Sequence, residues 1–329
     1  MNNYELNWSE LAFASKKPLK SLNAVFISAP RVMSISRLTQ LIKQYLPTGN
    51  IVIGCAEELY IDGYDGQAQF KTLQSGDIAA LVDKVNKSPS PHKITVLHYR
   101  QSDIVAIYNK VKFHSVVLVN GSWQYSFHLR PEYYALVSQN IPFDFVSPFV
   151  DEIEAMEYAN NFKSRITPKA NNLFTDVEML RIANAAAKDS FDTSFQTGTS
   201  LGKRSGNKYE FIATSYNKTV PYLTFAWHHG ALRERHLSPS GDLNYYDTVH
   251  AEIMLLAEAQ KKGLVLVGTS LFINLLPCPT CARVLCETDI SEIVYSLDHS
   301  NGYAVALLEK AGKTVRRLVD NDYLINKEG

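Results

Sequence analysis

The sequence is poor in cysteine, has no excess of either charge and contains no long uninterrupted apolar run. Four cysteines in 329 residues are too few for the disulfide framework of a small secreted domain. Lysine plus arginine number 33, as do aspartate plus glutamate, so the chain lacks the strongly basic balance of proteins that grip long nucleic acids. The apolar run at 264–276 is interrupted by polar residues and is shorter than the ~20 residues that span a bilayer.

A secretory signal is also missing from the start of the sequence. MNNYELNWSE has neither a basic segment nor an apolar core, and such signals contain both. With 46% hydrophobic and 20% charged residues, the chain has the composition of an ordinary globular protein, and its length suits two domains. We therefore expect a soluble cytoplasmic protein that does not associate with membranes.

The first half of the sequence alternates strand-like and helical patterns. Apolar runs occur at 24–30, 50–58, 93–99, 115–123 and 143–149. Segments with helical period lie between them, at 36–46, 77–87, 103–111 and 131–139. Buried strands separated by helices are typical of a parallel sheet that is covered on both faces. The pattern predicts a Rossmann-like α/β domain over residues 1–165.

No phosphate-binding motif reveals the ligand of this first domain. Neither G-x-G-x-x-G nor G-x-x-x-x-G-K-[ST] is present. Ligands of open α/β sheets sit beyond the carboxyl ends of the strands. The residues expected at those ends are Arg31, Glu57, Arg100 and Asn120. They are interpreted as polar loop residues, with a role as ligand contacts as the alternative.

A polar stretch separates the two halves. Residues 163–175 (KSRITPKANNLFT) contain a proline and two asparagines and show no sustained period, as expected for a linker. Thr175 followed by Glu178 is a capping-box pattern that predicts the start of a helix over 176–190. Strand and helix patterns follow, which predicts a second α/β domain over residues 172–329.

Two cysteines in the second half have the spacing of metal ligands. Cys278 and Cys281 belong to PCPTC, and Pro277 is predicted to open a helix, where its missing N–H costs nothing. Both sulfurs then project to one side of the first turn, and the helix dipole favours their thiolate forms. Cys286 lies five residues beyond Cys281, about 140° around the helix, so a buried apolar role is favoured over ligation for it.

A histidine and a glutamate complete this pattern. His250 and Glu252 stand in HAE, at the start of an apolar helix that ends at 261–263. A set of three ligands, here His250, Cys278 and Cys281, with one open position is typical of catalytic zinc, which lowers the pKa of its bound water. Glu252 is then placed to move that water's proton. A structural zinc site needs a fourth ligand, and a redox CxxC leaves HAE unexplained.

With these residues in place, the second half resembles the zinc-dependent cytidine and deoxycytidylate deaminase superfamily. HAE followed by PCPTC matches its H-x-E…P-C-x-x-C signature. The similarity runs roughly from 176 to 318 and is greatest to deoxycytidylate deaminases. It implies an αβα deaminase fold with a mixed five-stranded sheet. It also implies that His250, Cys278 and Cys281 bind Zn²⁺ and that Glu252 is the proton shuttle.

Substrate contacts follow less directly from the resemblance. Asn217, in SYN, matches the asparagine that contacts the sugar, and Tyr295 and Asp298 approach the base by their position. Arg233 and Arg235 are candidate contacts of a substrate phosphate. Since Glu234 lies between them, they are equally well interpreted as surface charges.

The sequence departs from the superfamily in two places. Residues 218–248 form a long stretch between SYN and HAE. Its histidines, His228, His229 and His236, suggest a second zinc site, but no cysteine accompanies them, and solvated loop histidines are the favoured interpretation. The first half of the chain matches no familiar partner of a deaminase.

The leading hypothesis is hydrolytic deamination of a cytosine nucleotide, dCMP to dUMP with release of ammonia, by a homo-oligomeric enzyme. One alternative is a tRNA or nucleic-acid deaminase whose first domain presents the substrate, which the balanced charge disfavours. A second is a nucleotide-binding sensor with a non-catalytic deaminase domain. The complete set of His250, Glu252, Cys278 and Cys281 disfavours that sensor.

Overall fold

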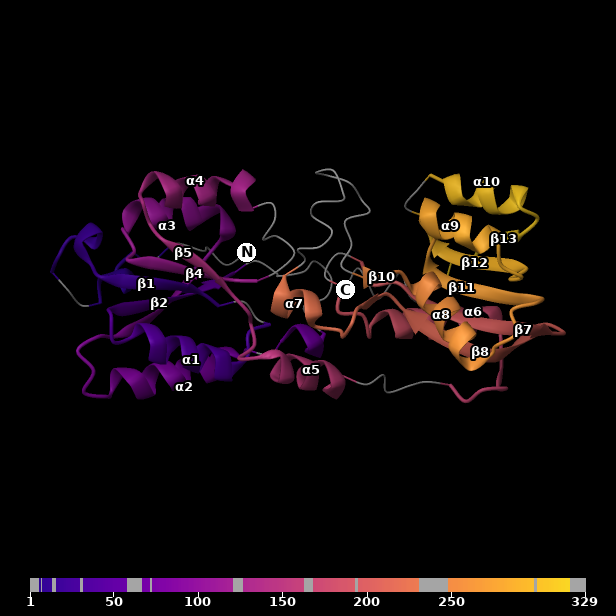
Figure 1. The fold of residues 1–329 in the computed structure, drawn as a ribbon, viewed down its shortest axis with the longest axis horizontal. Coiled ribbons are helices and arrows are strands. Elements are labelled where there is room, and N and C mark those ends of the chain that lie inside the picture. The colour runs from indigo at the N-terminus through magenta and orange to yellow at the C-terminus, as the bar shows by residue number, and fades with distance from the viewer. Residues whose placement is uncertain are drawn as a thin grey trace. The chain divides into compact units, whose positions relative to one another are not determined.

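The chain forms two compact units in the computed structural model (Figure 1). The first unit comprises Met1–Ala159 and Thr224–Tyr245, and the second comprises Asn160–Leu223 and Tyr246–Gly329. None of the helices in the described part of the chain combines the length and apolar character that a membrane crossing requires. The structure describes residues 6, 8–13, 16–29, 32–57, 67–71, 73–120, 127–162, 168–192, 195–230, 248–298 and 301–319.

A five-stranded parallel sheet forms the centre of the first unit. Its strands are β1 (Ala24–Ser28), β2 (Asn50–Ala56), β3 (Ile94–Tyr99), β4 (Ser115–Val119) and β5 (Phe143–Val146). They lie in the order β3-β2-β1-β4-β5, and every neighbouring pair is parallel. The connecting helices are α1 (Ile35–Tyr45), α2 (Ser75–Asn86), α3 (Ile104–Lys110) and α4 (Pro131–Ser138). The five strands and four helices that the sequence predicts are therefore present, and the parallel sheet is confirmed.

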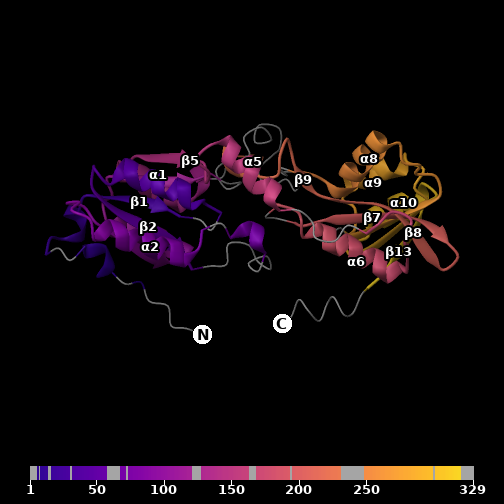
Figure 2. The same cartoon turned by 90° about the horizontal axis from the view of Figure 1, so that it is seen from below.

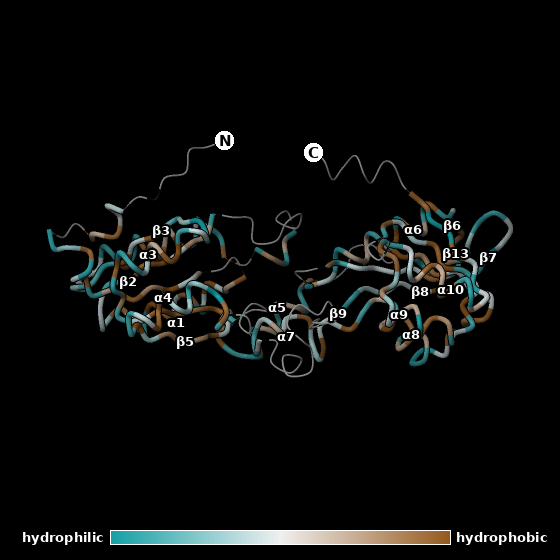
Figure 3. Tube along the Cα trace, turned by 90° about the horizontal axis from the view of Figure 1, so that it is seen from above, coloured by the Kyte–Doolittle hydropathy of each residue, from teal (hydrophilic) through white to brown (hydrophobic). Residues whose placement is uncertain are grey.

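Each face of this sheet has its own apolar core, because alternate residues of a strand point to opposite faces. Phe26 of β1 packs with Tyr99 and Tyr108 in one core, to which α3 and α4 contribute. Ile27, the next residue, lies in the other core with residues of α1 and α2. Figure 1 shows these two helix pairs on opposite faces of the sheet. Figure 3 shows hydrophobic residues following the strands and hydrophilic residues at the turns.

The first unit also includes a short helix from the second half of the sequence, α7 (Phe225–His229). The Trp227 ring lies 5.8 Å from that of Phe70. The Thr224 hydroxyl donates to the carbonyl of Ala155 at 2.7 Å, in α5 (Glu152–Asn161). The sequence did not predict that this segment joins the first unit. The domain limits 1–165 and 172–329 stay predictions.

The second unit is built on a mixed sheet of six strands, ordered β13-β12-β11-β7-β8-β6. β11 pairs in parallel with β12, and β12 with β13, whereas β11–β7, β7–β8 and β8–β6 are antiparallel. The strands are β6 (Leu173–Phe174), β7 (Gly198–Ser205), β8 (Lys208–Tyr216), β11 (Thr269–Leu275), β12 (Glu292–Leu297) and β13 (Thr314–Arg317).

The predicted number of five strands is wrong because the end of the predicted linker joins the sheet. Phe174 of β6 pairs with Tyr209 of β8. The backbone of Phe211 exchanges hydrogen bonds with Asn171 and Asn172, at 3.0 and 2.9 Å. The polar composition of this stretch predicted a loop, but its backbone satisfies the groups at the open edge of β8, which would otherwise be unpaired.

Helices cover both faces of the second sheet (Figure 2). On one face, α6 packs through Met179 against Phe211 and Phe272. The other face is covered by three helices, among whose buried residues are Leu255, Leu285 and Leu308. The helices are α6 (Asp176–Ala187), α8 (Ala251–Lys262), α9 (Pro279–Cys286) and α10 (Tyr303–Lys310).

The structure confirms the predicted start of α6 and contradicts the predicted start of α9. The capping box that begins α6 is confirmed, with Thr175 and Glu178 each bonded to the other's backbone amide. The prediction that Pro277 opens a helix is wrong. α9 starts two residues later, with Cys278 as its N-cap and Pro279 in the first turn. Because either proline satisfies the preference for a residue without an N–H at that position, the sequence pattern alone selects the wrong one.

Candidate active site

His250 stands at the N-terminus of α8. Its backbone is extended, with φ −61° and ψ 151°, and it is the N-cap of the helix. The chain reaches it through β10 (Thr248–Val249), which pairs antiparallel with β9 (Lys218–Thr219). Buried Ala251 and Leu255 fix the first turns of α8 on the sheet. The imidazole therefore stands where a rigid helix meets the short β9–β10 ribbon.

The two cysteines stand at the N-terminus of α9, directly after β11. The Cys278 sulfur accepts a hydrogen bond from the backbone N–H of Cys281 at 3.4 Å, and so it caps the helix. Cys281 is buried with 2% of its surface exposed, whereas Cys278 is half-buried. Both sulfurs lie at the positive end of the helix dipole, which favours thiolates.

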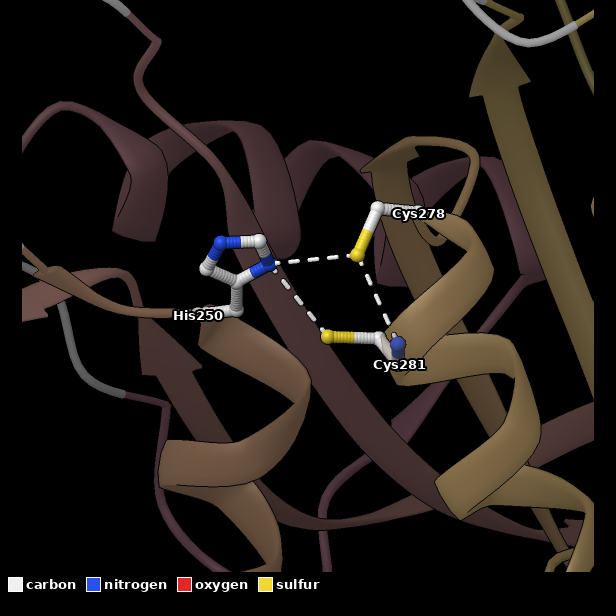
Figure 4. Close-up of side chains that lie close together, drawn as sticks. All are labelled: His250, Cys278 and Cys281. Carbon is white, nitrogen blue, oxygen red and sulfur yellow. Dashed lines mark hydrogen bonds between the residues drawn. The ribbon is translucent and has the colours of Figure 1, made fainter. Parts of the chain in front are cut away.

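Figure 4 shows that the His250 imidazole faces both sulfurs. Its Nδ1 lies 3.5 Å from Cys278 Sγ and 3.3 Å from Cys281 Sγ. The three potential ligand atoms lie within 4.8 Å of one another. Ligands around tetrahedral zinc, with Zn–S near 2.3 Å and Zn–N near 2.05 Å, stand about 3.5–3.8 Å apart. One imidazole nitrogen and two sulfurs at nearly this spacing fit zinc, and a fourth position remains for a water or substrate.

The electrostatics of the metal-free cluster also favour a cation. The pKa of the Cys278 thiol is lowered to about 4, first by a hydrogen bond from the Cys281 thiol and further by His250. The pKa of Cys281 is raised, because its proton is held by Cys278 and because it is buried. One thiolate thus exists near neutral pH without a metal. A divalent cation that displaces the second proton would leave two negative sulfurs paired with two positive charges.

Glu252 lies behind this cluster, in the first turn of α8. Its side chain is buried, with only 2% of the residue exposed, and it lines a pocket together with His250 and Cys278. Burial raises the pKa of the Glu252 carboxyl to about 7, against the opposing effects of its own backbone amide and of His250. A carboxyl group with this pKa takes up and releases protons at neutral pH, as general acid–base catalysis requires.

Polar side chains also line the pocket. The Asp192 carboxylate accepts hydrogen bonds from Asn217 Nδ2 at 2.9 Å and from Thr248 Oγ1 at 2.7 Å. Asn217 Nδ2 also donates to the carbonyl of Phe195, and its Oδ1 accepts from the backbone of Thr197. All five residues line the pocket. Asn217 therefore holds the segment 192–197 in place, and Asp192 joins both to Thr248.

The sequence interpretation did not identify Asp192 and Thr248 as site residues. Thr248 stands two residues before His250, and this proximity was a usable signal. Asp192 comes from the turn between α6 and β7, far from the metal motifs in sequence, and no local pattern distinguishes it from a surface aspartate. Only its burial, at 9% exposed, and its partners reveal its place.

The other predicted substrate contacts are not found among the residues of the pocket that the structure describes. Tyr295 is buried in the apolar core of the second unit, at 8% exposed, and Asp298 is an exposed residue just after β12. Neither is among the described residues that line the pocket. Arg233 and Arg235 lie outside the described residues, as does His236. The roles of these residues stay predictions.

Among the described residues, none of the remaining candidate ligands belongs to the cluster of His250, Cys278 and Cys281. The Cys286 sulfur lies 3.9 Å from the carbonyl of Leu307 and packs in the apolar core, as the sequence suggested. His229 is exposed and lies 3.3 Å from Glu152. The expectation of solvated histidines is wrong for His228, which is half-buried with its Nδ1 2.6 Å from the Ser147 hydroxyl.

The raised pKa of Glu252 predicts how the stability of the metal-free protein depends on pH. Below 4.5 the carboxyl is protonated in both states, and between 4.5 and about 7 only the folded state keeps its proton. The free energy of unfolding therefore falls by about 3 kcal/mol as the pH rises through this window. In urea unfolding of chelator-treated protein, Glu252→Gln should become more stable relative to wild type from pH 5 to pH 8. A constant difference would contradict the raised pKa.

Comparisons with known proteins agree with this geometry. Residues 174–297 match the family model of the cytidine and deoxycytidylate deaminase zinc-binding region. Deoxycytidylate deaminase of Saccharomyces cerevisiae is 35% identical over 107 residues, which cover 32% of this chain and 34% of that protein. Deoxycytidylate deaminase of Enterobacteria phage T4 is 28% identical over 64 residues, covering 20% and 33%. The chain thus spans about a third of the length of these relatives.

Solved structures of deaminases are also similar to part of the chain. The dCMP deaminase from the cyanophage S-TIM5, in apo form, is 18% identical and has a TM-score of 0.33. The aligned region covers 44% of this chain and 96% of that chain. A structure from a study of tRNA:A34 deaminases is also 18% identical, with a TM-score of 0.29, covering 43% and 98%.

Proposed function

Since residues 174–297 carry the zinc-binding region of cytidine and deoxycytidylate deaminases, we propose that the protein catalyses hydrolytic deamination of a cytosine nucleotide. The observation that carries this proposal is the cluster of His250, Cys278 and Cys281, of which His250 and Cys278 line one pocket together with buried Glu252. Water supplies the oxygen that replaces the amino group at C4, and ammonia leaves. The substrate is dCMP, in line with the relatives named deoxycytidylate deaminase.

The chain's own residues divide the work between holding a metal and moving protons. His250 Nδ1 and the sulfurs of Cys278 and Cys281 would hold a zinc ion, which supplies Lewis-acid activation of a water molecule. The Glu252 carboxylate accepts a proton from that water. It delivers that proton to N3 of the cytosine ring, and then takes the second proton from the oxygen newly bonded to C4 and delivers it to the departing amine. Because burial raises the pKa of this carboxyl in the metal-free protein, the group is suited to act both as base and as acid at neutral pH.

The polar residues of the pocket form the binding site for the sugar of the substrate. Asp192, Asn217 and Thr248 form one hydrogen-bonded group that lines the pocket. Since Asn217 is bonded to the backbone on both sides, it is held in one orientation. A rigid group of polar side chains of this kind orients the hydroxyl groups of a sugar, while the base reaches Glu252.

Ammonia release from a substrate panel tests the proposal. Zinc-loaded protein is assayed with dCMP, CMP, deoxycytidine, dCTP, single-stranded DNA and tRNA. We expect kcat/KM to be highest for dCMP, with dUMP as the second product. Release from tRNA or DNA alone would replace the proposed substrate with a nucleic acid. No release from any of these substrates would refute the function.

Asp192→Asn is expected to raise KM for dCMP by about tenfold and to change kcat less. Asn217 and Thr248 both donate to Asp192 Oδ2, and the Phe195 backbone N–H donates to Oδ1. An asparagine keeps the shape but has one acceptor oxygen in place of two, so the donors on one of the two sides lose their acceptor, at a cost of about 1–2 kcal/mol. Steady-state kinetics check this, with exposed Asp289→Asn as the control. A fall in kcat with an unchanged KM would show that Asp192 acts on the chemistry instead.

A further inference from the structure

The first unit contains a cavity at the carboxyl ends of its strands. Its volume is about 500 Å³, which suits a small organic ligand. Ile78 of α2 and Val96 of β3 contribute to an apolar wall, and Cys55 of β2 also lines it. Burial and, secondarily, Glu57 raise the pKa of the Cys55 thiol to about 11. That wall is therefore uncharged at neutral pH, which favours a flat, apolar part of a ligand.

A carboxylate and an imidazole stand at the rim of this cavity. Glu57 follows β2 and His98 belongs to β3, and both line the cavity. Glu57 Oε1 lies 2.8 Å from His98 Nδ1, with the two side chains 44% and 57% exposed. The backbone N–H of Glu57 donates to the carbonyl of Tyr99 at 2.8 Å, which fixes the residue at the strand end. The pair therefore offers solvent-facing polar atoms at a defined place.

The position of the cavity favours a ligand of nucleotide type. In open parallel sheets, ligands bind beyond the carboxyl ends near the reversal of strand order, and an acidic residue at the end of the second strand bonds the ribose hydroxyls. Here the order reverses between β1 and β4, and Glu57 follows β2. Glu57 thus has the position and the chemistry of a diol acceptor, although the chain has no glycine-rich phosphate motif.

Helix α7 limits the size of the ligand, because it contacts the carboxyl ends of β4 and β5 in the same sheet. Asn120, after β4, donates from Nδ2 to the carbonyl of His228 at 3.0 Å. Ser147, after β5, has its hydroxyl 2.6 Å from His228 Nδ1. The chain's own α7 thus contacts the edge beyond β4 and β5, where the second half of a dinucleotide would lie. Space for one nucleoside remains on the side of β2 and β3.

We propose that this cavity binds a single ribonucleoside or its phosphate. The base lies against Ile78 and Val96, and the vicinal hydroxyls of the ribose donate to the Glu57 carboxylate, which His98 holds in place. The site belongs to the first unit and does not depend on the proposed deaminase activity. It gives the first unit a function of its own in recognising a nucleotide.

Calorimetric titration of the zinc-loaded full-length protein with adenosine and guanosine tests the proposal. Purines are used because the proposed deaminase substrate is a pyrimidine. We expect saturable binding of one equivalent of at least one of the two. Its 2′-deoxy analogue should bind at least ~10-fold more weakly, as should the ribonucleoside to Glu57→Gln, because each change removes a hydrogen bond to a charged group. No binding up to ~1 mM, or equal affinity for the 2′-deoxy analogue, would overturn the proposal.

A blocking variant identifies the cavity as the place of binding. Ala79 lines the cavity from the exposed surface of α2, and Ala80 beside it is exposed but does not line it. Ala79→Trp should abolish binding, whereas Ala80→Trp should bind as wild type does. Cytosine-nucleotide deamination should be the same in both variants. Unchanged binding in Ala79→Trp would place the nucleoside elsewhere and refute the site, while leaving the proposed function untouched. Addition of the matching 5′-monophosphate shows whether the site prefers the phosphate.

Discussion

Glu252→Gln is expected to lower kcat for cytosine-nucleotide deamination by at least ~10⁴-fold while zinc content stays near that of wild type. Proton transfer by one positioned group contributes about 10²–10⁴-fold, and here a single carboxyl serves more than one transfer. Glutamine keeps the size of the buried side chain and cannot exchange a proton at neutral pH. Because Glu252 is not assigned as a ligand, the cluster of His250, Cys278 and Cys281 should still hold its metal.

The measurement is paired, with metal analysis and the deamination rate taken on the same preparation. Glu258→Gln is the matched control, since Glu258 lies on the same helix, is half-buried and pairs with Lys262 at 3.0 Å. It should retain wild-type activity. If Glu252→Gln keeps a substantial fraction of the rate, the proton-shuttle role fails, and the sensor hypothesis of a non-catalytic nucleotide-binding domain gains support.

The sequence predicted those parts of the fold that local patterns determine. The strands of the first sheet are continuous Val- and Ile-rich runs because both of their faces are buried, as at Val25, Phe26 and Ile27. The metal motifs were also predictable, since HAE and PCPTC each concentrate unusual residues at a helix N-terminus. Thr175 and Glu178 were predictable for the same reason, because a capping box needs only two residues at fixed spacing.

Long-range pairing could not be predicted in the same way. β6 is only two residues long and owes its existence to the open edge of β8, which no pattern in 173–174 reveals. No local pattern in 225–229 predicts that α7 joins the first unit, because its place there depends on contacts of Trp227 with Phe70 and of Thr224 with Ala155. Asp192 was missed because its importance derives from partners that are distant in sequence.

Cys281→Ala is expected to remove most of the bound zinc and with it the deaminase activity. The loss in affinity should exceed the ~10–100-fold that removal of an outer hydrogen-bond partner costs, because a ligand atom itself is removed. The apparent stability of the zinc-loaded protein should fall as well, since a metal that binds only the folded state stabilises it in proportion to RT ln(1 + [Zn]/Kd). Metal analysis after gel filtration and urea unfolding with and without chelator measure both effects.

Cys286→Ala is the matched control for this loss. Cys286 lies at the end of the same helix α9, is half-buried, and has its sulfur 3.9 Å from a backbone carbonyl, outside the cluster. It should keep about one zinc per chain and full activity, and its unfolding should remain sensitive to chelator. In Cys281→Ala the same chelator should have little further effect, because the metal is already absent. If both variants retain zinc equally, the second thiol ligand is not Cys281, and the pairing with Cys278 at the start of α9 does not hold the metal.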